Sequence, residues 1–246
     1  MTLLTEFSNL QLLAIGAIFI WTGFVRSGLG FGGAALGLPF MLFVYNQPVF
    51  WLPVIGTHLL FFSGLTLRSR LNDVDWVYLR RSYIYILIPT LVGIFGLLNL
   101  PTKWLLIFIY SVTLFYAITW ALGISIRSQS PWVDKILLAL GGYIAGTSLT
   151  GAPLMVAVFV HNVKKEFLRN TLFVLWFSLV SMKMSAFIAL GVNIQWQTAL
   201  LLIPVAAIGH VIGLKAHDHI IKNDHLFRRI LGVVLVVIST LGLIYH

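Results

Sequence analysis

The chain has no cysteine, little charge and few acidic residues. Without cysteine there are no disulfides, no thiolate chemistry and no cysteine-ligated metal sites. Charged residues make up 9% of the 246 positions, against about 25% in a soluble globular protein. With 59% hydrophobic residues and a mean hydropathy of +0.98, the composition excludes an ordinary soluble protein and predicts a membrane protein.

Long apolar runs fill most of the chain. They are roughly 17–22 residues long, which is the length needed to cross the hydrocarbon core of a bilayer. The N-terminus lacks the basic region and cleavage site of a removable signal peptide, so none is expected. The runs predict an all-α, polytopic membrane protein with ten helical segments. The expected segments are approximately 9–25, 31–46, 49–67, 82–99, 103–122, 135–146, 150–162, 170–190, 196–214 and 227–245.

The basic residues gather in alternate connections between these segments. Of the 16 Lys and Arg residues, all but Lys103 and Lys183 fall in loops that follow odd-numbered segments. Cytoplasmic loops of membrane proteins carry such an excess of positive charge. The asymmetry therefore accounts for the net charge of +9 without a nucleic-acid partner. It predicts that the loops after odd-numbered segments are cytoplasmic and that both termini lie outside.

Two stretches that interrupt apolar runs resemble each other. Residues 23–40 read GFVRSGLGFGGAALGLPF, and residues 142–159 read GYIAGTSLTGAPLMVAVF. Their alignment places Gly23 opposite Gly142 and Gly33 opposite Ala152. We therefore expect two membrane repeats of five segments, residues 1–122 and 135–246, joined by a polar linker over 123–134. An odd number of segments per repeat inverts the second copy relative to the first.

Glycine-rich breaks in membrane helices are tolerated where they line a cavity rather than face lipid. Paired breaks at corresponding positions of two halves indicate a transporter's binding site. The breaks here predict broken or re-entrant helices near the midplane of the membrane. The short segments 135–146 and 150–162 favour re-entrant hairpins, but the sequence does not decide between hairpins and full spans.

The polar residues inside the predicted segments favour an anion. All seven acidic residues are expected in loops or termini, whereas Arg26 and Lys183 fall at or within apolar segments. Intramembrane charges are costly and usually functional, and helix N-termini at the breaks also attract anions. His58 and His210 are candidates for coupling or gating. The predicted substrate-binding residues are Arg26, Ser27, Gly30, Gly32, Gly33, Thr147, Ser148, Thr150, Gly151 and Lys183.

Each of these residues also has a structural interpretation. Arg26 would serve as a topology anchor at the end of a full-length first segment. Lys183 would extend its ammonium group toward the membrane surface, and the glycines would allow close helix packing. The histidines at 217, 219 and 225 fit no zinc pattern, so no metal and no cofactor is expected. The GxGxxG pattern at residues 28–33 lacks the strand and the acidic residue of a dinucleotide site.

The motifs together resemble the TauE/SafE sulfite exporter family, which includes 4-toluene sulfonate uptake permease-like transporters. They are GLGFGGAALGLPF at 28–40, GTHLLFFSGLTLRSRLNDVDW at 56–76 and GTSLTGAP at 146–153. The resemblance covers approximately residues 10–245. It implies transport of sulfite, thiosulfate or an organosulfonate across the cytoplasmic membrane. The second motif contains more hydroxyl side chains and less glycine than is common in the family, which leaves the substrate preference open.

The function expected is a secondary transporter of a small sulfur-containing oxyanion, working by alternating access. An anion channel on the same repeats is the alternative. A membrane-embedded hydrolase would need a nucleophile beside Lys183, but Ser181 lies two residues away and so does not share its helix face. No GxSxG or HExxH element is present either, and we expect no enzymatic activity. The expected partners are the anionic substrate and the lipid bilayer, and a homodimer is also considered.

Overall fold

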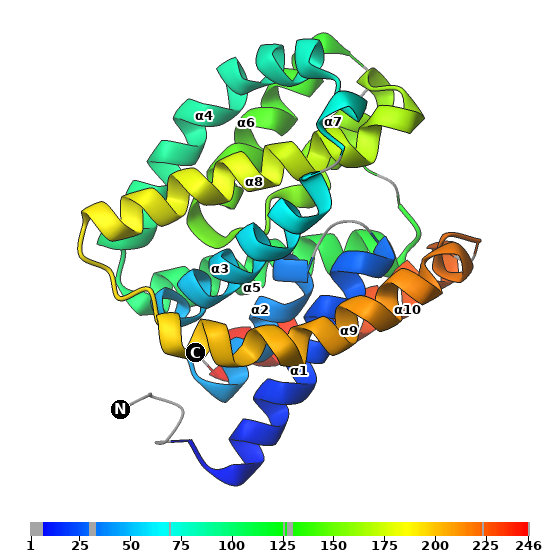
Figure 1. Cartoon of the computed structure of the whole chain (residues 1–246). Helices are drawn as coiled ribbons and strands as arrows, with labels where there is room; N and C mark the ends of the chain where they lie inside the picture. The colour runs from blue at the N-terminus through cyan, green and yellow to red at the C-terminus, as the bar shows by residue number, and fades with distance from the viewer. Residues whose placement is uncertain are drawn as a thin grey trace. The chain divides into compact units, whose positions relative to one another are not determined.

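The structure is a computed structural model that describes residues 7–29, 33–68, 70–124, 126, 130–222 and 224–245. Within these ranges all regular structure is helical, which confirms the predicted all-α class (Figure 1). Ten α-helices and one short 3-10 helix, η2 (Leu71–Asp73), are described, and each α-helix corresponds to one predicted segment. The helices are α1 (Asn9–Leu29), α2 (Gly33–Val44), α3 (Pro48–Leu67), α4 (Trp76–Asn99), α5 (Thr102–Ala121), α6 (Pro131–Ser148), α7 (Ala152–Asn162), α8 (Lys165–Ala189), α9 (Trp196–Lys222) and α10 (Asp224–Tyr245).

Seven of the described helices are long and apolar enough to cross a membrane: α1, α3, α4, α5, α8, α9 and α10. The helices α2 and α7 contain 12 and 11 residues. At about 1.5 Å per residue they are roughly 18 Å and 16 Å long, well short of a hydrocarbon core of about 30 Å. The chain is therefore a multi-pass membrane protein with two helices that are too short to span.

Several helices begin before the predicted segments because charged residues within their first two turns interrupt the apolar run. Helix α6 begins at Pro131, within the predicted linker, where the Ser130 hydroxyl accepts a hydrogen bond from the Val133 amide at 3.4 Å. Helix α4 begins after Asp75, whose carboxylate accepts from the Tyr78 amide at 2.9 Å. Hydropathy locates the apolar part of a helix and misses such capped turns.

The helix ends also correct the expected placement of the acidic residues. Four of the seven were expected in loops but lie inside α-helices, close to their ends, because polar end turns extend beyond the apolar runs. They are Asp134, Glu166, Asp218 and Asp224.

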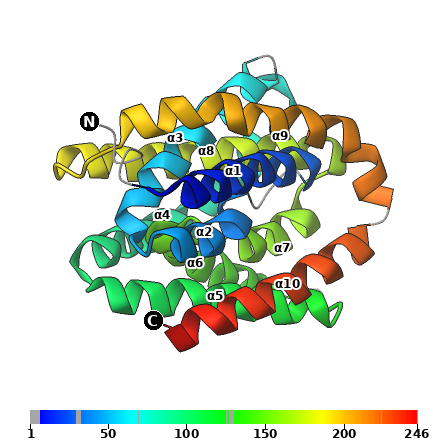
Figure 2. The same ribbon diagram turned by 90° about the horizontal axis from the view of Figure 1, so that it is seen from below.

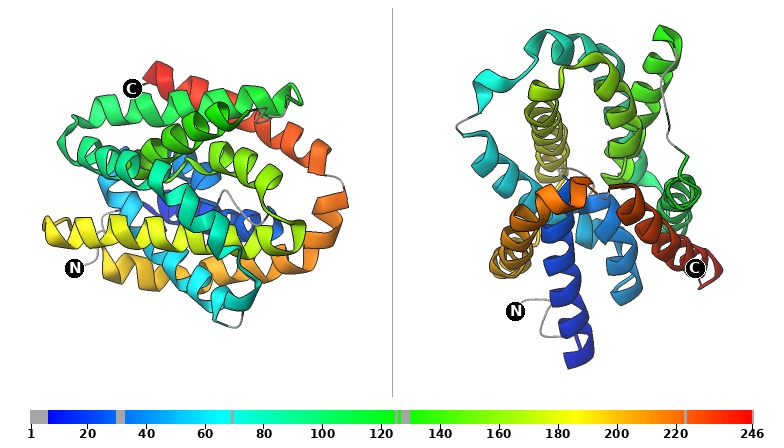
Figure 3. Two further views of the ribbon diagram at one scale, coloured as in Figure 1. Left: turned by 90° about the horizontal axis from the view of Figure 1, so that it is seen from above. Right: turned by 90° about the vertical axis from the view of Figure 1, so that its right-hand side faces the viewer.

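The described chain divides into two compact units. The first unit comprises residues 1–54, 101–125 and 195–246, and the second comprises residues 55–100 and 126–194. In the first unit α1 packs along α9 and α5 packs along α10 (Figure 2), and α2 lies beside α1 (Figure 3). In the second unit α4 packs along α6, and α7 contacts both α6 and α8. Each unit thus combines helices from both halves of the chain.

Glycines set the distance between the paired helices. A Cβ atom on Gly23 of α1 would lie 2.1 Å from the carbonyl oxygen of Ala206 on α9, and one on Gly209 would lie 1.8 Å from that of Ile20. Real Cβ atoms do not approach so closely, so only glycine allows this crossing. Close approach of backbones through small residues is a main source of helix association in membranes, where lipid and protein are equally apolar.

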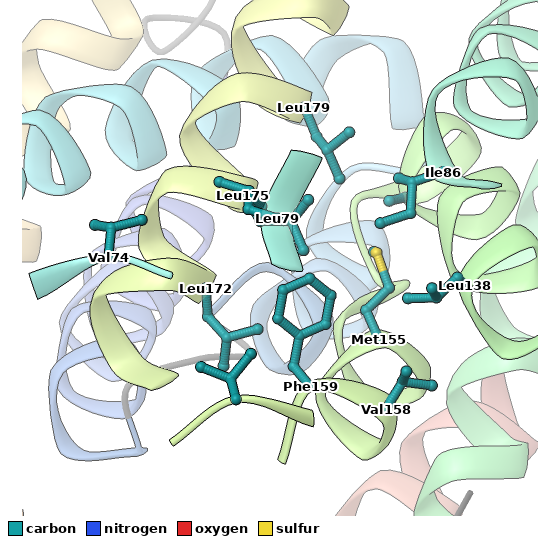
Figure 4. Packing of buried hydrophobic residues seen from close by; sticks show 12 residues of the cluster. Val74, Leu79, Ile86, Leu138, Met155, Val158, Phe159, Leu172, Leu175 and Leu179 are labelled. Carbon is teal, nitrogen blue, oxygen red and sulfur yellow. The ribbon is translucent and has the colours of Figure 1, made fainter. Parts of the chain in front are cut away.

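The apolar core of the second unit fills the space between α4, α6, α7 and α8. Figure 4 shows the ring of Phe159 on α7 pointing toward Leu79 on α4, with Leu172 and Met155 on either side. This close packing supplies dispersion contacts and fixes α7 beside the break that follows α6. A smaller cluster in the first unit joins α1, α2, α5 and α10 through Val25, Leu36, Ala117, Leu231 and Leu235.

Candidate functional site

The first glycine-rich break lies between α1 and α2 in the first unit. Helix α1 ends at Leu29 and α2 begins at Gly33. A Cβ on Gly33 would lie 3.0 Å from the Cβ of Arg26 and 3.2 Å from the carbonyl oxygen of Thr22. The start of α2 therefore lies against the last turns of α1. The predicted binding residues Gly30 and Gly32 lie outside the described residues.

Arg26 and Ser27 occupy the end of α1 and are both buried. Their exposed fractions are 7% for Arg26 and 2% for Ser27. A topology anchor would extend its guanidinium group into water, whereas Arg26 lies within the protein. The burial of Arg26 therefore places a positive charge beside the first break.

Ser27 joins α1 to α9 through a contact with His210. The Ser27 hydroxyl donates to the carbonyl oxygen of Gly23 at 3.0 Å, and its oxygen also lies at hydrogen-bond distance from His210 Nδ1. A hydroxyl has one proton to donate. While that proton serves Gly23, His210 must carry its own proton on Nδ1 and donate to Ser27. The pair thereby links the tautomer of His210 to the orientation of the Ser27 hydroxyl.

The second break lies between α6 and α7 in the second unit. Helix α6 ends at Ser148, Leu149 adopts a left-handed conformation with φ of 61°, and Gly151 caps the start of α7. A Cβ on Gly151 would lie 2.0 Å from the carbonyl oxygen of Gly141. The break therefore requires glycine at position 151 for a close backbone approach.

The three hydroxyl side chains of the second break are buried and engaged with one another or with the backbone. The hydroxyl oxygen of Thr147 lies 3.0 Å from the carbonyl oxygen of Tyr143 and 3.3 Å from that of Gly93, so the two oxygens share its single proton. Ser148 donates to the carbonyl oxygen of Ile144 at 3.1 Å, and its oxygen lies 2.6 Å from that of Thr150. With Ser148 donating to Ile144, the proton between the two hydroxyls comes from Thr150. A ligand would receive that proton only by replacing the Ser148–Thr150 bond.

Lys183 lies on α8, six residues before the helix ends at Ala189. Its side chain is 1% exposed, so the ammonium group does not reach the surface as a snorkelling lysine would. Within the described residues Lys183 Nζ has no hydrogen-bond partner. Burying an unpaired ammonium group costs several kcal/mol, and this cost favours binding of a compensating anion.

The two histidines proposed for coupling or gating belong to different units. His58, on the part of α3 in the second unit, is buried, and its ring meets that of Phe62 edge-to-face with 6.3 Å between centroids. His210 belongs to the first unit through its contact with Ser27. Within the described residues no group of three His, Cys, Asp or Glu side chains is placed to hold a metal. The side chains of His217 and His219 fall outside them.

Each unit brings part of the predicted site together. In the first unit Arg26, Ser27 and Gly33 lie at the α1–α2 break. In the second unit Thr147, Ser148, Thr150 and Gly151 form the α6–α7 break, and Lys183 lies on α8.

Asn170, a buried amide on α8, is not among the site residues predicted from the sequence. Its Oδ1 has no hydrogen-bond partner among the described residues. The only signal in the sequence was a polar amide at the start of an apolar segment.

Comparison with known proteins identifies the family. The model of the family described as Sulfite exporter TauE/SafE matches residues 14–241, a stretch that reaches from α1 into α10. A search of curated proteins and a search of solved structures found no match. Because the family match covers nearly the whole chain and its helices, the protein is a multi-pass membrane protein of the TauE/SafE sulfite exporter family.

Proposed function

We propose that the protein is a secondary transporter of a small sulfur-containing oxyanion, such as sulfite, thiosulfate or an organosulfonate, and that it works by alternating access. The observation that carries the proposal is Lys183, a buried ammonium group on α8 with no hydrogen-bond partner in the described part of the chain. In a sulfite exporter family, an anionic substrate is the partner that such a group requires.

Each break would supply contacts for an anion within its own unit. Arg26 adds positive charge at the first break, and the breaks place the N-termini of α2 and α7 beside Gly33 and Gly151. Free N–H groups and the helix dipole favour oxyanion oxygens at such positions. Thr150 is the hydroxyl best placed to donate, because its proton is shared only with Ser148.

The short helices support the re-entrant form of the breaks. Helices α2 and α7 are too short to span the membrane, and each follows a glycine-rich break at the end of its preceding helix. We take both as half-helices that end inside the membrane, so that the α1–α2 and α6–α7 breaks lie near its midplane.

Matching contacts inside the two units support an inverted repeat. A Cβ on Gly213 would lie 2.3 Å from the carbonyl oxygen of Phe24, and one on Gly93 would lie 2.2 Å from that of Tyr143. Phe24 and Tyr143 come directly after Gly23 and Gly142 in the sequence, and the repeat alignment places these two glycines opposite each other. The α1–α9 pair of the first unit therefore corresponds to the α6–α4 pair of the second.

The pairing also indicates how the repeats are assembled. Helices α4 and α9 are the fourth helices of their repeats, so each pair would combine the first helix of one repeat with the fourth of the other. The α1–α9 pair consists of odd-numbered helices and the α4–α6 pair of even-numbered ones. This difference in parity is the one expected of inverted copies that contain an odd number of segments each.

Flux through proteoliposomes tests the proposal. Vesicles containing the purified protein would be loaded with sulfite, thiosulfate, sulfate or chloride, and efflux would be measured with the wild type and with Lys183→Met. We expect saturable flux of a sulfur oxyanion that falls by about 100-fold in the variant, because truncating a buried charge contact typically costs 2–5 kcal/mol or more. Lys103→Met, which removes an exposed charge, is the matched control.

Two outcomes would decide against parts of the proposal. Normal flux in Lys183→Met would remove that residue from the site. Flux that neither saturates nor shows counterflow would favour the anion channel over the transporter.

A further inference from the structure

The first turns of α4 and α6 lie at the same end of the second unit. A Cβ on Gly142 would meet Ile86, and one on Gly146 would meet Thr90. Both contacts advance by four residues in the same direction, so the two helices run parallel. Basic residues near the start of each helix are therefore brought to one end of the unit.

Lys135 lies over two aromatic rings at this end. Its Nζ atom is 4.9 Å from the ring centroid of Trp132 and 5.6 Å from that of Tyr85 on α4. Trp132 is 73% exposed. Arg81 is also exposed and lies four residues before Tyr85, which places both on one face of α4. These four residues, Arg81, Tyr85, Trp132 and Lys135, form the basic–aromatic patch.

The patch lies at the edge of an apolar surface. Exposed aliphatic side chains follow it along both helices, including Ile84 and Ile88 on α4 and Ile136 on α6. Trp, Tyr, Lys and Arg at the end of such a surface mark the boundary between hydrocarbon and headgroups. The patch therefore faces the level of the membrane at which phospholipid phosphates lie.

We propose that the basic–aromatic patch binds the phosphate headgroup of an anionic phospholipid. Arg81 and Lys135 supply two positive charges for the phosphate, Tyr85 and Trp132 hold the Lys135 ammonium group in place by cation–π contacts, and the neighbouring aliphatic side chains contact the acyl chains. Asp134, the acidic residue next to Lys135, is engaged by the side-chain amide of Asn162 at 3.2 Å. Basic sites between membrane helices bind anionic headgroups in this way.

The chain offers a matched control for this site. The Asn162–Asp134 contact brings the junction of α7 and α8 to the same end of the second unit. Lys164 and Lys165 at that junction are exposed, and no aromatic contact is found for either within the described residues. The double variant Lys164→Gln/Lys165→Gln removes the same charge from the same end while leaving the basic–aromatic patch intact.

Native mass spectrometry of the purified protein with phosphatidylglycerol and phosphatidylcholine tests the proposal. We expect the wild type to prefer phosphatidylglycerol and Arg81→Gln/Lys135→Gln to bind it about 30-fold more weakly, the effect of two basic side chains near an anionic headgroup. The control double variant should change binding by less than about threefold. Trp132→Ala, which keeps the charge, should weaken it by about threefold to fivefold.

Three results would overturn the proposal. One is equal binding of the two lipids, and another is an equal loss in both double variants, which would indicate a diffuse charge effect without a site. The third is displacement of phosphatidylglycerol by an equal concentration of sn-glycerol 3-phosphate, which would indicate a soluble anion. All variants alter exposed or partly exposed side chains, and an unchanged thermal unfolding temperature establishes that they are folded.

Discussion

Two helix pairs cross in a similar way, α1 with α9 in the first unit and α4 with α6 in the second. Both crossings contain close backbone contacts at glycine, but the side chains around these contacts differ. In the first crossing Ser27 contacts the side chain of His210. At the corresponding place in the second crossing, Gly146 faces the backbone of Thr90, and a Cβ there would lie 2.2 Å from the carbonyl oxygen.

The two crossings are therefore alike in their backbone packing and differ in their side-chain chemistry. The glycine contacts that hold the helix pairs occur in both crossings, whereas the titratable group occurs in one. In the first crossing the titratable side chain is His210, while the second unit contains the Thr147–Ser148–Thr150 hydroxyls and the buried Lys183. Substitutions at corresponding positions of the two units test this division.

The largest effect on stability is expected for substitutions at the close glycine contacts that both crossings contain. Gly23→Ala places a methyl group 2.1 Å from a backbone oxygen of α9, which forces the helices apart, and we expect a loss of about 3 kcal/mol in the free energy of unfolding. Gly142→Ala meets an oxygen at 2.6 Å and should cost less. Thermal unfolding in detergent measures both.

Gly16→Ala is the control for these variants, because a Cβ at that position of α1 meets nothing within 4 Å. It should leave stability unchanged or raise it by up to about 1 kcal/mol through helix propensity. If Gly16→Ala and Gly23→Ala were equally stable, the close approach would not determine the pairing of α1 with α9.

A smaller effect is expected where the chemistry of the two crossings differs. Ser27→Ala removes the hydroxyl that contacts His210, and loss of one buried hydrogen bond costs about 1 kcal/mol. Thr90→Val, at the position corresponding to His210, removes only a bond from Thr90 to the carbonyl oxygen of Ile86 within α4, and should cost less. Chemical denaturation of the two variants compares these losses, and equal losses would contradict a special role for the Ser27–His210 contact.

The smallest effect is expected at the second break. Leu149 adopts a left-handed conformation that costs a side-chain-bearing residue roughly 1–2 kcal/mol, and the sequence alignment places glycine at the corresponding position 30. Leu149→Gly should therefore raise the free energy of unfolding by about 0.5 kcal/mol, the relief of strain being offset in part by lost packing. A thermal unfolding scan beside the wild type checks the sign, and a marked loss of stability would show that the Leu149 side chain is needed.

The number and order of helices could be predicted from the sequence because apolar length is a strong local signal in a membrane protein. The starts at Pro131 and Lys165 could not, since charged residues interrupt the apolar run in the first turns of both helices, and the start at Pro131 is marked by the Ser130 cap. The pairing of α1 with α9 was also out of reach. Gly209 and Gly213 read as ordinary small residues until their partners on α1 are known.

The candidate site was predictable in its residue types but less so in their roles. Arg26 and Lys183 stood out as charges at or within apolar segments, but whether they anchor at the surface or lie inside depends on tertiary packing. The hydroxyls of the second break were expected to face a ligand, and in the structure they first bond to the backbone and to each other. The sequence contains no signal for that competition, because it depends on which carbonyl oxygens lie within reach.

The pairing of α1 with α9 has a consequence for biogenesis. At a synthesis rate of about 5–20 residues per second, Ala206 emerges roughly 10–40 s after Gly23, whereas α6 follows α4 within about 3–11 s. The second unit can therefore assemble its helix pair while the first still waits for α9 and α10. During that interval the face of α1 around Gly23 has no α9 to cover it, so we expect the translocon or a membrane chaperone to shield the part of the protein that is made first and completed last.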